Sequence, residues 1–208
     1  MLFKDIVGHS TIKQKLTAIV NSNRISHAQL FMGKEGSGNL AMAIAFVQYL
    51  YCLNKTSEDA CGTCSACIKL NKLVHPDVHF VFPVATNEKI KKDPVSANFI
   101  ELWRNAVLQN AYLGLEEWQE IAETGNKQLL INTKESAEII KILSLKTYEA
   151  TYKTMIIWFP EKMNNASANK LLKILEEPPA NTLFILVAED AEQLLPTITS
   201  RVQTVKIP

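Results

Sequence analysis

The chain has 208 residues, 47% of them hydrophobic, and its 22 Lys and Arg residues nearly balance 21 Asp and Glu residues. This length is enough to bury a full core in one large domain, with or without an insertion. The formal net charge of +1 excludes a global basic field, so any contact with nucleic acid requires a local patch or partner chains. No signal segment and no membrane-length apolar run is present, which predicts a cytoplasmic protein with no membrane partner.

Short apolar runs alternate with segments of helical periodicity along the chain. The first predicted strand starts at His27 and runs into a glycine-rich loop. Further strands are predicted over 78–82, 155–159, 182–188 and 203–207. Helices are predicted over 13–21, 40–53, 96–109, 115–123 and 166–177. Near-continuous apolar strands that alternate with helices predict an α/β fold in which helices cover both faces of a parallel sheet.

The loop after the first predicted strand has the glycine spacing of a phosphate-binding loop. Gly33, Gly36 and Gly38 retain the backbone that would cradle phosphates. A working loop also needs a lysine for the terminal phosphates and a hydroxyl for Mg²⁺, but Asn39 and Leu40 occupy those two positions. From this pattern alone, a simple tight turn between strand and helix explains the three glycines equally well.

The acidic residues that would complete a nucleotide hydrolase are also missing. Trp158 and Phe159 end the strand predicted over 155–159, where an acidic pair would hold Mg²⁺ and polarise water. The nearest carboxylate, Glu161, lies beyond Pro160. Loss of both halves of the machinery indicates a nucleotide-hydrolase scaffold kept for its shape, which binds ATP or ADP weakly or not at all.

All four cysteines lie close together in the sequence, at Cys52, Cys61, Cys64 and Cys67. Four thiolates at this spacing are typical of a closed, tetrahedral structural zinc site. An iron–sulfur cluster is the chemical alternative, since sets of four cysteines also bind those clusters. Reduced, unliganded thiols are the third possibility, and clustering disfavours it because such thiols are readily oxidised.

The pattern loosens between residues 83 and 129, and this segment is predicted to be a helical insertion. It contains three large aromatic residues, Trp103, Tyr112 and Trp118. Such residues can anchor a partner protein at the centre of an interface. More often they pack the small core of inserted helices, and no function is assigned to this segment from the sequence.

Several blocks of the sequence resemble, in order, the bacterial clamp-loader subunits of DNA polymerase III. They are FKDIVGHSTIKQKLTAIVNSNRISHAQLFMGKEGSG, the four-cysteine knuckle, NNASANKLLKILEEPPANTLFILVAED and LLPTITSR. The resemblance covers nearly the whole chain apart from residues 83–129. Because both nucleotide motifs are degenerate, the chain looks like the delta-prime subunits rather than the gamma/tau ATPases.

The resemblance implies an AAA+ fold of three α/β/α layers with a five-stranded parallel sheet. The domain would span residues 1–208, with a zinc module at about 52–75, and lid and collar domains would follow residue 208. The implied function is that of a non-hydrolysing stator that works with gamma/tau and delta subunits to load the sliding clamp onto primer-template DNA. The alternatives are a gamma/tau-type ATPase with divergent motifs and a zinc-ribbon nucleic-acid binder, which the neutral charge balance disfavours.

The resemblance also implies a role for an arginine near the end of the chain. The family places a Ser-Arg-Cys motif where this chain has Ser200, Arg201 and Val202. By this match Arg201, with Ser200, is a finger that acts on the ATP of a neighbouring subunit, where a guanidinium stabilises the charge of phosphoryl transfer. The alternative is an ordinary salt bridge at the end of a strand.

Two further positions take their expected roles from the same resemblance. Lys173 matches a basic position that faces the DNA backbone, and its alternative is an ion pair with Glu176 or Glu177 on the same helix. The family's phosphate sensor, a threonine or asparagine after the fourth strand, is replaced by Ala188 and Glu189. The sensor is thus the third nucleotide-binding group that the chain lacks.

Overall fold

The computed structural model describes all 208 residues, and its centre is one sheet of five parallel strands. The strand order is β2-β3-β4-β1-β5, so β1 lies between β4 and β5. The strands are β1 Ala28–Met32, β2 Val78–Val81, β3 Lys153–Trp158, β4 Thr182–Ala188 and β5 Gln203–Lys206. The predicted five-stranded parallel sheet is confirmed, and the largest difference is that β3 begins at Lys153 rather than at residue 155.

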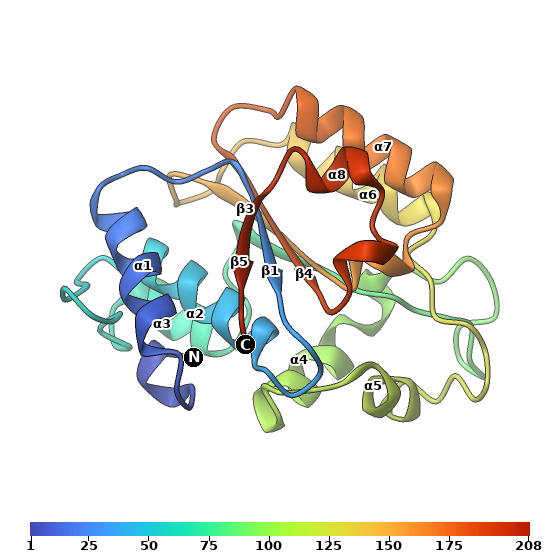
Figure 1. Ribbon diagram of the computed structural model, residues 1–208. Coiled ribbons are helices and arrows are strands. Elements are labelled where there is room, and N and C mark those ends of the chain that lie inside the picture. The colour runs from blue at the N-terminus through green and yellow to red at the C-terminus, as the bar shows by residue number, and fades with distance from the viewer.

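Helices cover both faces of the sheet, which confirms the predicted three layers (Figure 1). On one side lie α1 Ser10–Asn21, α2 Asn39–Tyr51 and α3 Ser65–Asn71. On the other side lie α6 Thr133–Ser144, α7 Asn165–Glu176 and the short α8 Pro196–Thr199. None of these helices has both the length and the hydropathy that crossing a membrane requires.

The strands read as apolar runs because each face of the sheet is buried under helices. Alternate residues of a strand point to opposite faces. Phe31 and Ile185 therefore belong to the core under α1 and α2, whereas Leu30 and Leu186 belong to the core under α6 and α7. Every residue of β4 is buried, as expected for a central strand of a parallel sheet.

Residues 83–129 form a compact helical segment whose two ends lie side by side. It contains a 3₁₀ turn over Ser96–Phe99, α4 Ile100–Gln109 and α5 Leu115–Ile121. Its ends are joined by an antiparallel bridge between Val84 and Leu130. The segment lies below the edge at which the strands end, next to the loop that connects β1 to α2 (Figure 1).

An aromatic cluster packs this segment against the sheet. The ring of Trp103 stacks on Phe82, with centroids 4.8 Å apart, and lies 6.1 Å from Trp158 of β3. Trp118 meets Phe82 edge-on, and its Nε1 donates a hydrogen bond to the carbonyl of Pro83 at 2.9 Å. Both Trp103 and Trp118 are fully buried. Their role is thus core packing, and neither side chain is available to anchor a partner.

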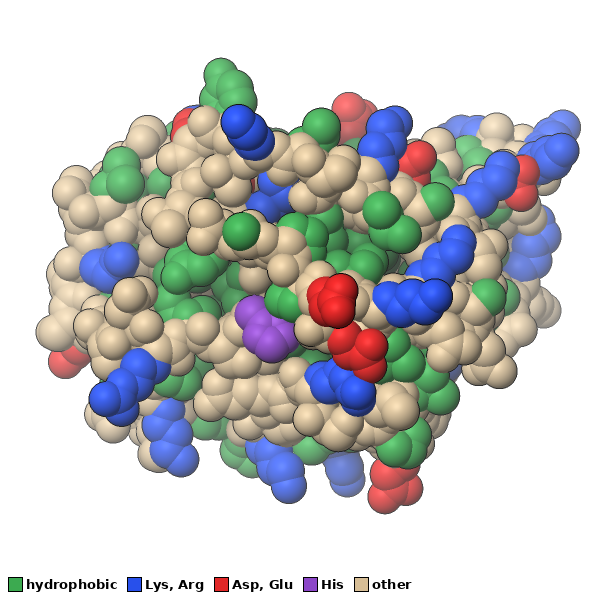
Figure 2. Space-filling view, turned by 90° about the horizontal axis from the view of Figure 1, so that it is seen from above, with side chains coloured by type: hydrophobic (Ala, Val, Ile, Leu, Met, Phe, Trp, Pro, Cys, Tyr) green, Lys and Arg blue, Asp and Glu red, His purple; other side chains and the backbone are tan.

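The edge at which the strands begin carries a different surface. Figure 2 shows Lys and Arg side chains spread around this face, with apolar side chains in the hollows between them. One cavity at this edge has a volume of about 710 Å³ and lies between the end of α2 and residues 149–152. The two edges of the sheet thus present different chemistry.

Candidate functional site

The glycine-rich loop joins β1 to α2 at the carboxyl edge of the sheet, the edge where the strands end. Gly38 precedes α2 with φ of +78°, a left-handed conformation that favours glycine. At Gly33 a side chain would collide with the carbonyl of Ile207, which lies 2.7 Å from the position of a Cβ. The backbone of a phosphate-binding loop is therefore present, with the start of α2 behind it.

Asn39 occupies the position of the missing lysine and points inward. Its Nδ2 donates hydrogen bonds to the carbonyls of Gly33 at 3.0 Å and Ala188 at 3.1 Å. Its Oδ1 accepts a hydrogen bond from the N–H of Leu40 at 2.8 Å. The side chain therefore fastens the loop to the end of β4 and presents no positive charge to a phosphate.

Trp158 and Phe159 stand at the end of β3 and offer no ligand to a metal ion. Both are buried, and their ring centroids lie 4.7 Å apart. Phe159 has the left-handed angles φ 54° and ψ 58°, which are uncommon for a bulky residue. The positions of the missing acidic pair therefore serve the aromatic core.

Carboxylates gather in the space in front of the loop. One cavity of about 230 Å³ is lined by five acidic residues and one lysine: Glu35, Glu116, Glu161, Glu189, Asp190 and Lys162. Burial, followed by the negative charges of Glu35 and Glu161, raises the pKa of Glu189 to about 7. Burial also raises the pKa of Glu161, although its Oε1 accepts a hydrogen bond from the N–H of Glu189 at 2.9 Å. A phosphate entering here would meet negative charge.

The loop also has contacts with segments that are distant in the sequence. His9 Nε2 lies 3.0 Å from the carbonyl oxygen of Ser37, and Tyr112 from the 83–129 segment packs against Gly38. No local sequence pattern predicts these contacts, because they join residues that are far apart in the sequence.

Arg201 lies at the opposite edge of the sheet, just before β5. Its Nη2 forms an ion pair with Glu176 Oε1 at 2.8 Å, and its Nη1 donates to the carbonyl of Thr197 at 2.9 Å. Ser200 Oγ is 3.3 Å from the same Nη1. Within the single chain, then, the salt-bridge alternative describes the state of Arg201, although 37% of its side chain remains exposed.

Lys173 is exposed on α7, towards the end of that helix. It takes part in none of the ion pairs of the chain, and Glu176 pairs with Arg201 instead. The alternative for Lys173, an ion pair with Glu176 or Glu177 on the same helix, is therefore not formed, and the side chain is exposed.

The four cysteines converge into one cluster between the end of α2 and α3. Their Sγ atoms all lie within 4.8 Å of one another, and those of Cys61 and Cys67 are 4.0 Å apart. Sulfur atoms around one tetrahedral zinc ion are about 3.8 Å apart, as Zn–S bonds of about 2.3 Å require. This spacing fits a single ion better than a larger iron–sulfur cluster.

Backbone groups also prepare the sulfur atoms for a cation. The N–H of Cys61 points at Cys52 Sγ at 3.2 Å, and the N–H of Cys64 points at Cys61 Sγ at 3.3 Å. Hydrogen bonds from the N–H groups of Thr63 and Cys64 lower the pKa of Cys61 to about 6. Burial raises the pKa of the Cys67 thiol. The cluster can hold a metal ion once its thiols are deprotonated.

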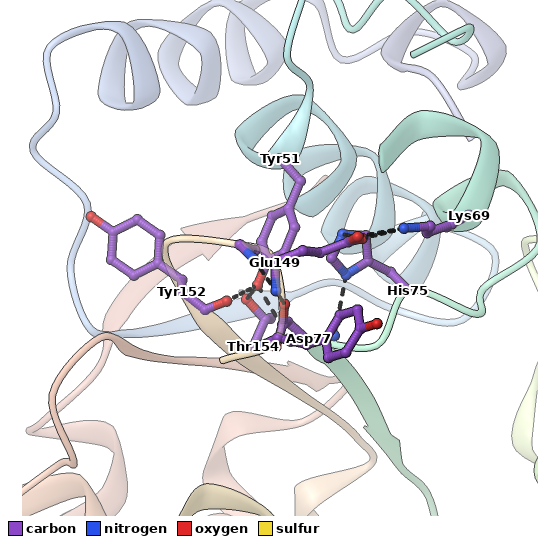
Figure 3. Close-up of polar contacts among 9 residues, drawn as sticks. Tyr51, Lys69, His75, Asp77, Glu149, Tyr152 and Thr154 are labelled. Atoms are coloured by element: carbon purple, nitrogen blue, oxygen red, sulfur yellow. Dashed lines mark hydrogen bonds and ion pairs between the residues drawn. The ribbon is translucent and has the colours of Figure 1, made fainter. Parts of the chain in front are cut away.

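A polar network that the sequence did not reveal lies beside this cluster (Figure 3). The carboxylate of Asp77 accepts hydrogen bonds from three successive N–H groups, those of residues 148, 149 and 150. His75 Nε2 lies 3.1 Å from Glu149 Oε1, and Lys69 of α3 pairs with the same carboxylate. Tyr51 donates to the carbonyl of Tyr152 at 2.6 Å. Because each of these polar groups has a partner, the network fixes the entry to β3 against the cysteine cluster.

Comparison with known proteins is consistent with this geometry. The family model described as DNA polymerase III, delta subunit, matches residues 8–208. The DNA polymerase III subunit delta' of Bacillus subtilis is 31% identical over 185 residues, covering 89% of this chain and 43% of the relative. The gamma/tau subunit of Mycobacterium tuberculosis is 26% identical over 199 residues, covering 96% of this chain and 27% of the relative.

A solved structure supports the fold. A DNA polymerase III gamma-subunit-related protein from Thermotoga maritima superposes with a TM-score of 0.54 at 18% identity, covering 94% of this chain and 45% of that one. The likeness shows the fold, which is that of the AAA+ P-loop proteins. The chain spans less than half the length of each of these three proteins. With the family match over nearly all its residues, the chain belongs to the DNA polymerase III delta-subunit family.

Proposed function

We propose that this chain is the non-hydrolysing stator of a DNA polymerase III clamp loader and lends Arg201 to the ATP site of a neighbouring subunit. The observation that carries the proposal is that the degenerate nucleotide loop and Arg201 lie at opposite edges of the sheet. The carboxyl edge has the loop of a nucleotide site without its cation or metal ligands. The amino edge, where the strands begin, presents an arginine that its own loop cannot use.

The distance across the sheet supports the role of Arg201 in trans. β1 and β5 are parallel neighbours, with Gln29 opposite Gln203. Arg201 precedes the first of these pairs, whereas the loop follows β1, whose five residues span about 16 Å. Arg201 therefore lies at the edge opposite its own loop, which supports a role at the site of another molecule.

The ion pair with Glu176 is compatible with this role. Both side chains are more than one-third exposed, and an ion pair of this kind is worth about 0–1 kcal/mol. A terminal phosphate of ATP offers the guanidinium a stronger, charge-assisted partner. Exchange of Glu176 for a phosphate would thus cost little when a neighbouring subunit docks.

The same proposal names partners and a cofactor. The partners are gamma/tau and delta subunits, the sliding clamp and primer-template DNA. The exposed Lys173 would contact the DNA backbone, a contact that is independent of sequence and weakened by salt. Cys52, Cys61, Cys64 and Cys67 would hold one structural zinc ion, and metal analysis of the purified protein should find about one zinc per chain.

The experiment is to reconstitute the loader from full-length subunits and to measure its ATPase rate with clamp and primed DNA. Replacing Arg201 by alanine should lower this rate about 10²–10³-fold, because the transition-state charge loses its guanidinium. Arg24→Ala is the matched control, since Arg24 is also exposed at the amino edge. An unchanged ATPase rate with Arg201→Ala would show that Arg201 does not act as an arginine finger.

The match to gamma/tau subunits gives the second candidate, an ATPase with divergent motifs. This reading predicts Mg²⁺-dependent hydrolysis of ATP by the purified protein alone. Asn39→Lys separates the two readings further. This variant restores the cation but not the acidic pair, so hydrolysis of ATP by it would contradict the proposed non-hydrolysing function.

A further inference from the structure

The space in front of a phosphate-binding loop must be open for a nucleotide to enter. Phosphates bind at the backbone of the loop and at the amino end of the helix behind it. In this chain that position is bordered by Gly38, by the start of α2 and by the amino-terminal segment around Val7. Figure 1 shows the link between α4 and α5 running beside this loop.

Tyr112, in that link, occupies the space directly above Gly38. Its ring atom Cε1 would lie only 2.8 Å from a Cβ built on Gly38, so the ring is in contact with the main chain of the loop. Its hydroxyl accepts a hydrogen bond from the N–H of Val7 at 3.2 Å. The side chain thus bridges the loop and the amino-terminal segment.

The residues after Tyr112 continue across the loop. Gly114 lies close to the carboxylate of Glu35, which a side chain at this position would displace. Leu115 and Glu116 then line the acidic cavity. Leu113, between these contacts, is buried and belongs to the main core. The link is therefore anchored, and it approaches the loop at both Gly38 and Glu35.

We infer that residues 112–116 are a built-in occupant of the nucleotide cleft and that Tyr112 is the residue that excludes ATP. The ring takes the volume above Gly38 that a phosphate at the loop requires, and its hydroxyl ties that position to the N–H of Val7. This inference rests on the proposed non-hydrolysing role and names the group that keeps the site empty. It also gives the 83–129 segment a function that its own sequence did not suggest.

The test is a comparison of ATP affinities in four forms of the full-length protein. They are the parent, Asn39→Lys, Tyr112→Ala and the double variant, titrated with ATP and Mg²⁺ in a calorimeter. Lysine supplies the missing cation, and Mg²⁺ screens the carboxylates of the cavity. We expect the double variant to bind ATP at least about tenfold more tightly than Asn39→Lys alone, which corresponds to ~1.4 kcal/mol. Equal affinities of these two variants, including no binding by either, would overturn the inference.

Two controls keep the result specific. Tyr148→Ala, added to Asn39→Lys, removes a tyrosine that is 81% exposed at the far edge and should not change ATP affinity. An equal gain with Tyr148→Ala would refute a special role for Tyr112. If Tyr112→Ala lowers the melting temperature markedly, Tyr112→Leu replaces it, because leucine retains an apolar side chain but cannot reach Val7.

The outcome is independent of the test of the proposed function. Arg201 lies at the other edge, so the reconstituted ATPase assay reports on the finger whatever the cleft binds. If the double variant gains no affinity for ATP, the inference about Tyr112 is wrong but the proposed stator function is unaffected. If Arg201→Ala does not slow the reconstituted loader, the arginine finger is wrong but the inference about Tyr112 is unaffected.

Discussion

The carboxyl and amino edges of the sheet differ in how much of each is available to another molecule. At the carboxyl edge, Asn39 is bonded inward, aromatic rings occupy the two positions at the end of β3, and five acidic residues line the remaining cavity. At the amino edge, Arg201 and Lys173 remain exposed. The comparison shows that a site without the usual nucleotide ligands can still be filled by side chains of the fold. Here, Asn39 bonds to the backbone of the loop and Trp158 packs in the aromatic core, so these two residues contribute to the fold at positions where a nucleotide site would carry ligands.

The largest expected effect comes from removing the aromatic support of the carboxyl edge. Trp103→Ala should lower the free energy of unfolding by about 3–5 kcal/mol, because a fully buried ring leaves a cavity between Phe82 and Trp158. Urea unfolding measures the change. Leu102→Ala, at a neighbouring exposed position, is the control and should cost much less. A loss below about 1 kcal/mol for Trp103→Ala would mean that the helical segment is not packed as described.

Asn39→Ala should destabilise the protein by about 1–3 kcal/mol, because the carbonyls of Gly33 and Ala188 lose a buried donor. Thermal and urea unfolding both report this change. The matched variant Asn169→Ala removes an exposed amide from α7 and should stay within about 0.5 kcal/mol of the parent. Equal stabilities of the two variants would show that Asn39 does not fasten the loop.

Glu189→Gln should change how stability depends on pH. The pKa of Glu189 rises from its usual 4.5 to about 7 on folding, so between these values the folded state holds a proton that the unfolded state has released. The free energy of unfolding therefore falls as pH rises through this window. After allowance for solvent screening, the glutamine variant should melt about 1–3 °C higher than the parent at about pH 8. The two should coincide near pH 4, and a constant difference at all pH values would contradict the assignment.

The smallest effect is expected at the amino edge. Glu176→Gln removes the partner of Arg201 and should cost no more than about 1 kcal/mol, because both side chains are partly exposed. The difference should shrink further at about 1 M salt. Glu177→Gln, whose carboxylate makes no ion pair, is the matched control. A loss well above 1 kcal/mol would mean that Arg201 is held too firmly to act on a neighbour.

Much of the fold was predictable because β3 and β4 contain long apolar runs and the prolines after α7 end that helix. Helix α6 was not predicted as a separate element, since charged residues interrupt its apolar positions. A usable signal was present. Asn132 caps this helix by accepting hydrogen bonds from the N–H groups of Lys134 and Glu135, and asparagine followed three residues later by glutamate is a recognised start signal.

The site was predictable only where residue identity alone decides the chemistry. The spacing located Asn39, Trp158 and the cysteines correctly, and the absence of a lysine at Asn39 needs no structure to interpret. The inward direction of Asn39 and the contact of Tyr112 with Gly38 depend on segments that are far apart in the sequence. No periodicity or motif encodes such contacts, so only the folded chain reveals them.

The backbone at Phe159 has a further consequence. Its left-handed angles are adopted by aspartate and asparagine far more readily than by a large aromatic residue, which is strained there by about 1–3 kcal/mol. The main chain at this position therefore suits a small acidic side chain better than the aromatic ring that occupies it and touches Trp158. The end of β3 is thus compatible in its backbone with a metal-binding carboxylate that its sequence does not supply.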